Sequence, residues 1–262
     1  MLADPTERFL SDLPGARNLQ EASMLLGHYS RSLPTPRAAF DNDLGNPAFP
    51  MGKDGEPPGV ELGWPSDFIR RWAGGGLVLA CPLVVPCRKM RRPFSWGLDE
   101  DNLGLPEEDL PRPFTALGQQ TLSLLRQVGV RSGITVPVHQ PGGRTGFVSW
   151  VSDESLKTVR QWAEHHAGEL FLVGHAFLEH VDAMMAAGAA NIRDDCPLTE
   201  REREWLTWVA CGKTDSEIGI IIDRSPETAR FHVRNAIAKL DASSRSHAVA
   251  KAIRRDWLGP VE

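Results

Sequence analysis

The sequence has little cysteine, a single tyrosine and no long apolar run. Its four cysteines, at positions 81, 87, 196 and 211 of 262 residues, are too few and too widely spaced for a disulfide framework or a paired zinc signature. No stretch reaches the roughly 18 apolar residues that span a bilayer, and the first ten residues lack the basic and apolar segments of a signal peptide. These absences favour a cytoplasmic protein with no metal, no other cofactor and no membrane partner.

The charge balance is slightly acidic, which limits where nucleic acid can bind. The chain has 29 Lys and Arg against 34 Asp and Glu, a net charge of −5, so contact with nucleic acid needs a local basic patch. Residues 224–240, RSPETARFHVRNAIAKL, form such a patch, with four basic residues and one acidic residue. An excess of positive charge confined to one segment is what binding to phosphate requires.

The chain is long enough for two domains, and its pattern changes near residue 187. The stretch AAGAANIRDDCP is small, polar and ends in proline, as is typical of a linker. The 65 residues after it contain short helical patterns and no strand pattern. We therefore predict a first domain over residues 1–186, a linker over 187–197 and a second domain over 198–262.

The first domain mixes helical and strand patterns. Apolar spacing predicts helices over residues 18–33, 65–75 and 114–128, and strands in TPRAAFDND, GITVPV and TGFVSWV, the last two joined by a hairpin loop. Residues 44–63 carry too many Gly and Pro for a regular element and predict a long loop. One long helix is predicted over 153–187, with an apolar stripe wide enough either for the core alone or for the core and a second subunit.

The second domain shows four helices with clear start signals. Thr199 can cap the first helix, with Glu202 at the capping-box position and Gly212 as a C-terminal stop. Thr214 can start the second, Ser225 and the proline after it open the third, and SRSHAVAKAIRRDWL supplies the fourth. A short helix, a tight turn and a second helix follow the helix-turn-helix plan, in which the second of the two enters the major groove of DNA.

The third helix carries the chemistry for reading DNA. We expect its core-facing residues to be Phe231, Ala236, Ile237 and Leu240. We expect its candidate DNA contacts to be Thr228, Arg230, Arg234 and Lys239. Arg230 and Arg234 are one turn apart, so both can point into one groove, where an arginine binds guanine or phosphate. The alternative is a solvated basic face, which the pair of capped helices makes less favourable.

Residues 198–253, from LTEREREWL to AVAKAI, resemble the DNA-binding domain of LuxR-type transcriptional regulators over its whole length. The resemblance lies in the pairs and triplets Leu198-Thr199, Gly212-Lys213-Thr214 and Lys239-Leu240, among other positions. It implies binding to a double-stranded DNA operator, with Thr228, Arg230 and Arg234 as contacts. Two departures are small ones: Ala229 stands where valine is usual and Gly219 where alanine is usual.

The first domain resembles the acyl-homoserine-lactone-binding domain of quorum-sensing LuxR-type regulators. The order and intervals of six positions carry this resemblance: Pro65, Phe68, Trp72, Cys81-Pro82, Trp96 and Gly133. It implies an α+β fold class, in which an N-terminal α-β-α sandwich that senses a ligand and dimerises precedes a small all-α domain of four helices. It also implies a homodimer that regulates transcription.

Three departures from this family change the expected pocket. Phe68 stands where the family has a Trp that donates to the lactone carbonyl, Trp72 where it has a Tyr, and Cys81 where it has an Asp that accepts the ligand amide. A thiol is a weak hydrogen-bonding group, so two polar anchors are lost. We expect a small apolar signal molecule other than a standard acyl-homoserine lactone. The predicted ligand-binding residues are Phe68, Trp72, Cys81, Leu83, Trp96, Thr135 and Trp150.

Two other functions remain open at this point. The chain can be a ligand-independent regulator that acts constitutively or through mixed dimers with another regulator. It can also be an enzyme built on the histidines at positions 165, 166, 175 and 180. No acidic residue stands with those histidines in a metal or triad motif, so we predict that the protein is not an enzyme.

Overall fold

The computed structural model describes residues 4–45, 57–74, 77–110, 113–189, 196–255 and 257–258. The chain separates into two compact units, with residue 188 in the first and residue 189 in the second. Each unit has its own apolar core. None of the described helices is both long enough and apolar enough to cross a membrane.

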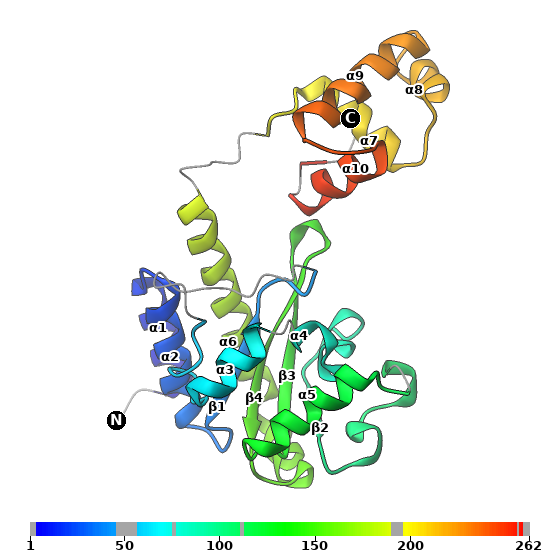
Figure 1. Ribbon diagram of the computed structural model, residues 1–262. Coiled ribbons are helices and arrows are strands. Elements are labelled where there is room, and N and C mark those ends of the chain that lie inside the picture. Colours follow the sequence, from blue (N-terminus) through cyan, green and yellow to red (C-terminus); the bar gives the residue numbers. More distant parts are fainter. Residues whose placement is uncertain are drawn as a thin grey trace. The chain divides into compact units, whose positions relative to one another are not determined.

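A four-stranded antiparallel sheet is the centre of the described N-terminal unit (Figure 1). Its strands are β1 (Arg37–Asp41), β2 (Phe94–Gly97), β3 (Ser132–His139) and β4 (Thr145–Ser152), in the order β1-β4-β3-β2. Ser149 in β4 lies opposite Ala39 on one side and opposite Thr135 on the other. This register aligns three small side chains across the middle of one sheet face.

Helices α1 (Pro5–Asp12), α2 (Leu19–Arg31) and α6 (Leu156–Ala189) cover the other face of the sheet. Phe177 of α6 packs edge-on against Phe40 of β1, with ring centroids 4.9 Å apart. Tyr29 of α2 meets Trp150 of β4 in the same way at 6.3 Å. Side chains alternate between the two faces along a strand, so these contacts fix which residues of β1 and β4 point toward α6.

The sheet face that carries Ala39, Thr135 and Ser149 is covered by α3 (Ser66–Gly74), the short α4 (Leu77–Ala80) and α5 (Ala116–Gln127). Short 3₁₀ turns over Pro82–Val84 and Pro86–Arg88 follow α4, because the prolines interrupt the apolar run. The unit is therefore an α-β-α sandwich, as its sequence predicts, and the fold class α+β is confirmed.

The α-helices of the C-terminal unit after residue 196 are, in its described part, α7 (Glu200–Ala210), α8 (Asp215–Ile221), α9 (Pro226–Lys239) and α10 (Arg245–Arg254). The predicted starts are confirmed, since Thr199 and Thr214 each form a complete capping box and Ser225 accepts from the Thr228 amide. Gly212 follows α7 with φ of 78°, a left-handed conformation that glycine adopts at little cost.

Most predicted helices and strands of the N-terminal unit lie within two or three residues of their predicted bounds. Helices α1 and α4 and strand β2 were not predicted. The predicted loop over 44–63 lies partly outside the described residues, and so does the predicted linker over 187–197.

One prediction for α9 is wrong. Phe231, expected in the core, is 51% exposed, and the buried positions are Ala229, Val233, Ala236 and Leu240. Their spacing of four, three and four residues forms a single stripe, and Phe231 lies off that stripe because each residue turns the helix by about 100°.

Candidate functional site

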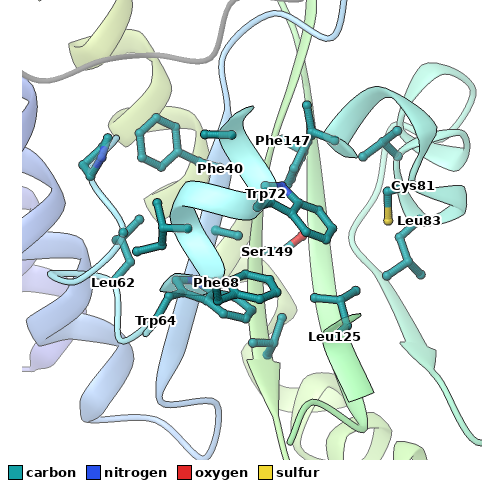
Figure 2. Close-up of a pocket in the computed structure, with 18 of the residues that line it drawn as sticks. Phe40, Leu62, Trp64, Phe68, Trp72, Cys81, Leu83, Leu125, Phe147 and Ser149 are labelled. Carbon is teal, nitrogen blue, oxygen red and sulfur yellow. The ribbon is translucent and has the colours of Figure 1, made fainter. Parts of the chain in front are cut away.

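A cavity of about 90 Å³ lies between the sheet and helices α3, α4 and α5. Phe68 and Trp72 come from α3, Cys81 and Leu83 from the segment after α4, and Ser149 from β4 (Figure 2). The lining side chains are almost all apolar. They are Ala39, Phe40, Pro58, Gly59, Leu62, Trp64, Phe68, Ile69, Trp72, Ala73, Val78, Cys81, Leu83, Val84, Trp96, Leu125, Phe147, Ser149 and Val151.

Three stacked aromatic rings form one wall of the cavity. Phe68 lies between Trp64, at 4.8 Å and 14° between ring planes, and Trp72, at 5.4 Å and 27°. The Trp64 indole N–H donates to the Ala38 carbonyl at 2.5 Å, so Trp64 presents only its apolar ring to the cavity. Trp72 is the half-buried end of the stack, which makes it the ring with the most room to move.

A chain of three hydrogen-bonding groups ends at Ser149. The Trp96 indole N–H donates to the Thr135 hydroxyl oxygen at 2.9 Å, and Thr135 shares a hydrogen bond of 2.6 Å with the Ser149 hydroxyl. When Thr135 donates its own proton to Ser149, the Ser149 proton is left to point into the cavity. The arrangement can therefore present a hydroxyl donor in an otherwise apolar space.

Cys81 carries no charge in this environment. Burial raises the pKa of its thiol to about 11, although hydrogen bonds with the Leu83 backbone and the Thr121 side chain act in the opposite direction. At neutral pH the thiol stays protonated. It therefore offers a ligand neither the negative charge nor the strong acceptor of a carboxylate.

The structure places five of the seven predicted pocket residues on the cavity wall: Phe68, Trp72, Cys81, Leu83 and Trp96. Thr135 is absent from the described lining but holds both Trp96 and Ser149. Trp150 is also absent from the described lining, and its predicted contact with a ligand stays a prediction. Its neighbours in β4 face the cavity, so its indole points to the opposite face and packs toward α6.

Most of the other lining residues were not predicted, among them the polar Ser149 and the stacked Trp64. Ser149 lies at an alternate position in TGFVSWV, so strand periodicity places it on the same face as Val151 and opposite to Trp150. That signal was available. Trp64 precedes the helix-start proline and carries no comparable pattern.

The outward face of α9 forms the candidate DNA-binding surface. Its exposed residues at helical spacing are Glu227, Arg230, Phe231, Arg234 and Ala238. Arg230 lies 3.6 Å from the Asp215 carboxylate at the start of α8, and Arg245 of α10 contacts the same carboxylate at 3.0 Å. The contact with Asp215 thus orients the Arg230 side chain relative to α8 and α9. Thr228 lies in the first turn of α9, where its hydroxyl is 3.0 Å from that of Ser225.

Lys239 has a partner within its own unit. Its ammonium donates to the Glu202 carboxylate at 2.8 Å, and the Thr199 amide donates to the same oxygen at 2.8 Å. Burial opposes ionisation of Glu202, but the hydrogen bonds from Lys239 and Thr199 outweigh it and lower the pKa of this carboxyl. Lys239 thus links α9 to the start of α7, and its predicted contact with DNA stays a prediction.

The histidines of α6 do not gather into a site. His175 hydrogen-bonds the Phe171 carbonyl on its own helix, and His180 hydrogen-bonds the Ala16 carbonyl. Across the ranges that the structure describes, no three His, Cys, Asp or Glu side chains are grouped so that they could hold a metal ion.

Two family models match the chain. The model of the autoinducer binding domain matches residues 22–181, and the model of bacterial regulatory proteins of the luxR family matches residues 196–252. The first match includes the sheet and the cavity, and the second includes α7, α8 and α9.

Several transcriptional regulators match about three quarters of this chain. The transcriptional activator AhyR of Aeromonas hydrophila is 26% identical over 205 residues, which is 75% of this chain and 72% of AhyR. LuxR of Aliivibrio fischeri is 23% identical over 72% of this chain and 71% of its own. The putative regulator y4qH of Sinorhizobium fredii is 34% identical over 77% of this chain and 56% of its own.

Solved structures share the fold. A crystal structure of Escherichia coli SdiA covers 97% of this chain and 98% of its own, with a TM-score of 0.63 and 16% sequence identity. SdiA in complex with octanoyl-rac-glycerol covers 95% of this chain and 93% of its own, with a TM-score of 0.58 and 17% identity.

Proposed function

Because the chain belongs to the LuxR family of transcriptional regulators with an autoinducer-binding domain, we propose that it is a dimeric, one-component sensor of a small apolar signal. Residues 1–186 bind the signal and dimerise, residues 187–197 link the parts, and residues 198–262 bind an operator. The observation that carries this proposal is the apolar cavity between the sheet and α3, with the Ser149 hydroxyl among its lining residues.

The signal is not a standard acyl-homoserine lactone. The lactone family pocket supplies a carboxylate for the ligand amide, but here the corresponding position is the neutral thiol of Cys81. Among the described lining residues there is no carboxylate at all. Losing a hydrogen bond to a charged group costs roughly 1.5–3 kcal/mol, which weakens binding about tenfold to a hundredfold. Phe68 adds to this loss because it has no donor for the lactone carbonyl.

A neutral molecule with an acyl chain and an oxygen acceptor fits the cavity better. The chain packs on the aromatic stack, and the oxygen accepts from Ser149. SdiA, whose fold is similar, has been solved with octanoyl-rac-glycerol, a molecule without a lactone. Since the cavity of about 90 Å³ is below the roughly 300 Å³ of small ligand sites, binding requires side chains to move. Trp72, at the exposed end of the stack, is the side chain we expect to move.

The C-terminal unit binds the operator through α9. Arg230 and Arg234 contact guanine or phosphate, and Thr228 contacts phosphate at the start of the helix. Asp215 holds Arg230 ready for this contact. We assign Lys239 mainly to bracing α9 against α7 through Glu202.

The second copy packs on α6. Phe171 and Leu172 are 38% and 51% exposed, and small residues, Gly168 and Ala176, lie one turn away on the same side of the helix. An exposed apolar strip flanked by small side chains allows two helices to approach closely. Dimerisation through α6 would bring two C-terminal units to the two halves of one operator.

A thermal melt of the full chain, made without added signal, tests the proposed sensor. We expect 1-octanoyl-glycerol to raise the melting temperature and N-octanoyl-homoserine lactone to raise it less at equal concentration. Ser149→Ala should reduce the rise with 1-octanoyl-glycerol, because it removes the donor hydroxyl. Thr6→Ala, a buried hydroxyl outside the cavity lining, is the control and should keep it. A larger shift with the lactone would refute the assigned ligand class.

The second candidate is a ligand-independent regulator, which acts constitutively or through mixed dimers. The small volume of the cavity favours it, since a nearly filled core needs no ligand to fold. A high melting temperature that neither ligand changes, combined with DNA binding by the unliganded protein, would support this alternative.

A further inference from the structure

Phe231 is a large apolar side chain that the fold of the C-terminal unit does not use. It is 51% exposed, while the side of α9 that faces the core is filled by Ala229, Val233 and Ala236. Leaving an aromatic ring in water forgoes the free energy of burying it. Because α9 is proposed to enter DNA, we expect the exposed ring of Phe231 to be covered by an apolar group there.

The position of Phe231 on the helix points to that partner. At about 100° per residue, Glu227, Arg230, Phe231, Arg234 and Ala238 fall within a sector of about 100°. All five are exposed. In this sector Phe231 lies about 60° around the helix axis from Arg234 and about 100° from Arg230, on the same side of both. A groove that Arg234 enters is therefore within reach of the ring.

Two further aromatic rings support Phe231 from the core side of α9. Phe231 meets the His232 ring edge-on, at 5.5 Å and 78°, and His232 stacks on Trp205 at 5.2 Å and 26°. Trp205 is 1% exposed and belongs to the core of the unit. The three rings form a column from the core to the surface of α9. A side chain held in this way loses less conformational freedom when it binds.

We propose that Phe231 reads a thymine in the operator by packing on its C5 methyl group. The major-groove edge of DNA presents hydrogen-bonding groups at every base pair, but thymine alone adds an apolar methyl group there. A phenyl ring cannot hydrogen-bond, so among the bases it can favour only thymine. The inference rests on the proposed function, since it requires that α9 enters the major groove with its exposed sector.

The test uses a duplex that the full-length protein selects from a random library. Each thymine of one half-site is replaced in turn by deoxyuridine, which removes only the methyl group. We expect one position at which this change weakens binding about fourfold, the effect of one buried methyl group. The Phe231→Ala variant should bind the selected duplex more weakly. Duplexes with thymine or with deoxyuridine at that position should then bind the variant equally well.

Two variants separate base reading from a general loss of structure. Phe231→Leu keeps an apolar side chain and should keep part of the methyl preference. Ile220→Ala removes an apolar side chain that is 82% exposed on α8, and it should leave the methyl preference unchanged. Circular-dichroism melts of all three variants check that the C-terminal unit is folded.

The outcomes distinguish this inference from the proposed function. If a duplex is selected but no thymine responds to deoxyuridine, or if Phe231→Ala keeps the same response, the assignment of Phe231 is wrong and DNA binding stands. If the protein enriches no duplex, DNA binding by α9 fails and the role of Phe231 fails with it.

Discussion

Replacing Lys239 tests whether this residue braces the C-terminal unit or binds DNA. Lys239→Met removes the ammonium that donates to Glu202, whose side chain is only 4% exposed. The carboxylate keeps the hydrogen bond from the Thr199 amide but loses its charged partner. An unsatisfied buried charge costs about 1–3 kcal/mol or more. Because the Lys239 side chain is 40% exposed, water replaces part of the contact, and we expect about 2 kcal/mol.

Hydrogen–deuterium exchange measures this cost within the full chain. A loss of about 2 kcal/mol should speed the exchange of protected amides in α7 and α9 about thirtyfold. Glu202→Gln combined with Lys239→Met should recover part of the loss, because the amide is neutral and still accepts from Thr199.

Arg234→Met is the matched control for this prediction. It should leave exchange nearly unchanged but reduce the salt dependence of DNA binding by about 0.9 in the log–log slope, if Arg234 contacts one phosphate. Unchanged exchange in Lys239→Met together with a reduced salt slope would refute the structural role of Lys239 and restore it as a DNA contact.

Three further predictions follow from single positions. Burial raises the pKa of Asp41 from 3.8 to about 6, so its ionisation opposes folding, and stability is lost as pH rises from about 4 to 6. Asp41→Asn should remove that loss and stabilise the N-terminal unit by up to about 3 kcal/mol at pH 7 in urea unfolding, and an unchanged pH profile would contradict it. Gly219→Ala should lower the melting temperature despite the better helix propensity of alanine, because a Cβ would lie 2.7 Å from the Arg224 carbonyl oxygen; a higher melting temperature would show that the turn relaxes easily. Leu172→Glu should dissociate the proposed dimer in sedimentation velocity, whereas Glu179→Ala on the same helix should not; a dimer that survives Leu172→Glu excludes this part of α6 as its centre.

The apolar periodicity of the sequence and its helix-capping residues predicted much of the fold. The predictions that failed did so for physical reasons. Thr199, Thr214 and Ser225 mark helix starts through local hydrogen bonds, which a sequence displays directly. Strand β2 is only four residues long and was not predicted, since its pairing partner β3 is far away in the sequence. Phe231 was expected in the core because its side chain is apolar, but its helical phase places it away from the buried stripe of α9.

The pocket was predicted in outline but not in its polar detail. The residues of α3 and the segment after α4 follow from a family resemblance in spacing, and four predicted residues of these segments line the cavity together with Trp96 of β2. The Trp96–Thr135–Ser149 hydrogen-bond chain could not be foreseen, because it depends on the register among β2, β3 and β4. Register is set by tertiary packing rather than by any one strand.

We propose that the cavity prefers a neutral, oxygen-bearing acyl compound to an acyl-homoserine lactone. Isothermal titration of the full-length protein with 1-octanoyl-glycerol and with N-octanoyl-homoserine lactone compares the two at equal chain length. We expect the acylglycerol to bind at least tenfold more tightly, since neither Phe68 nor Cys81 supplies the polar partner that a lactone ligand needs. Tighter binding of the lactone would refute the proposed ligand preference.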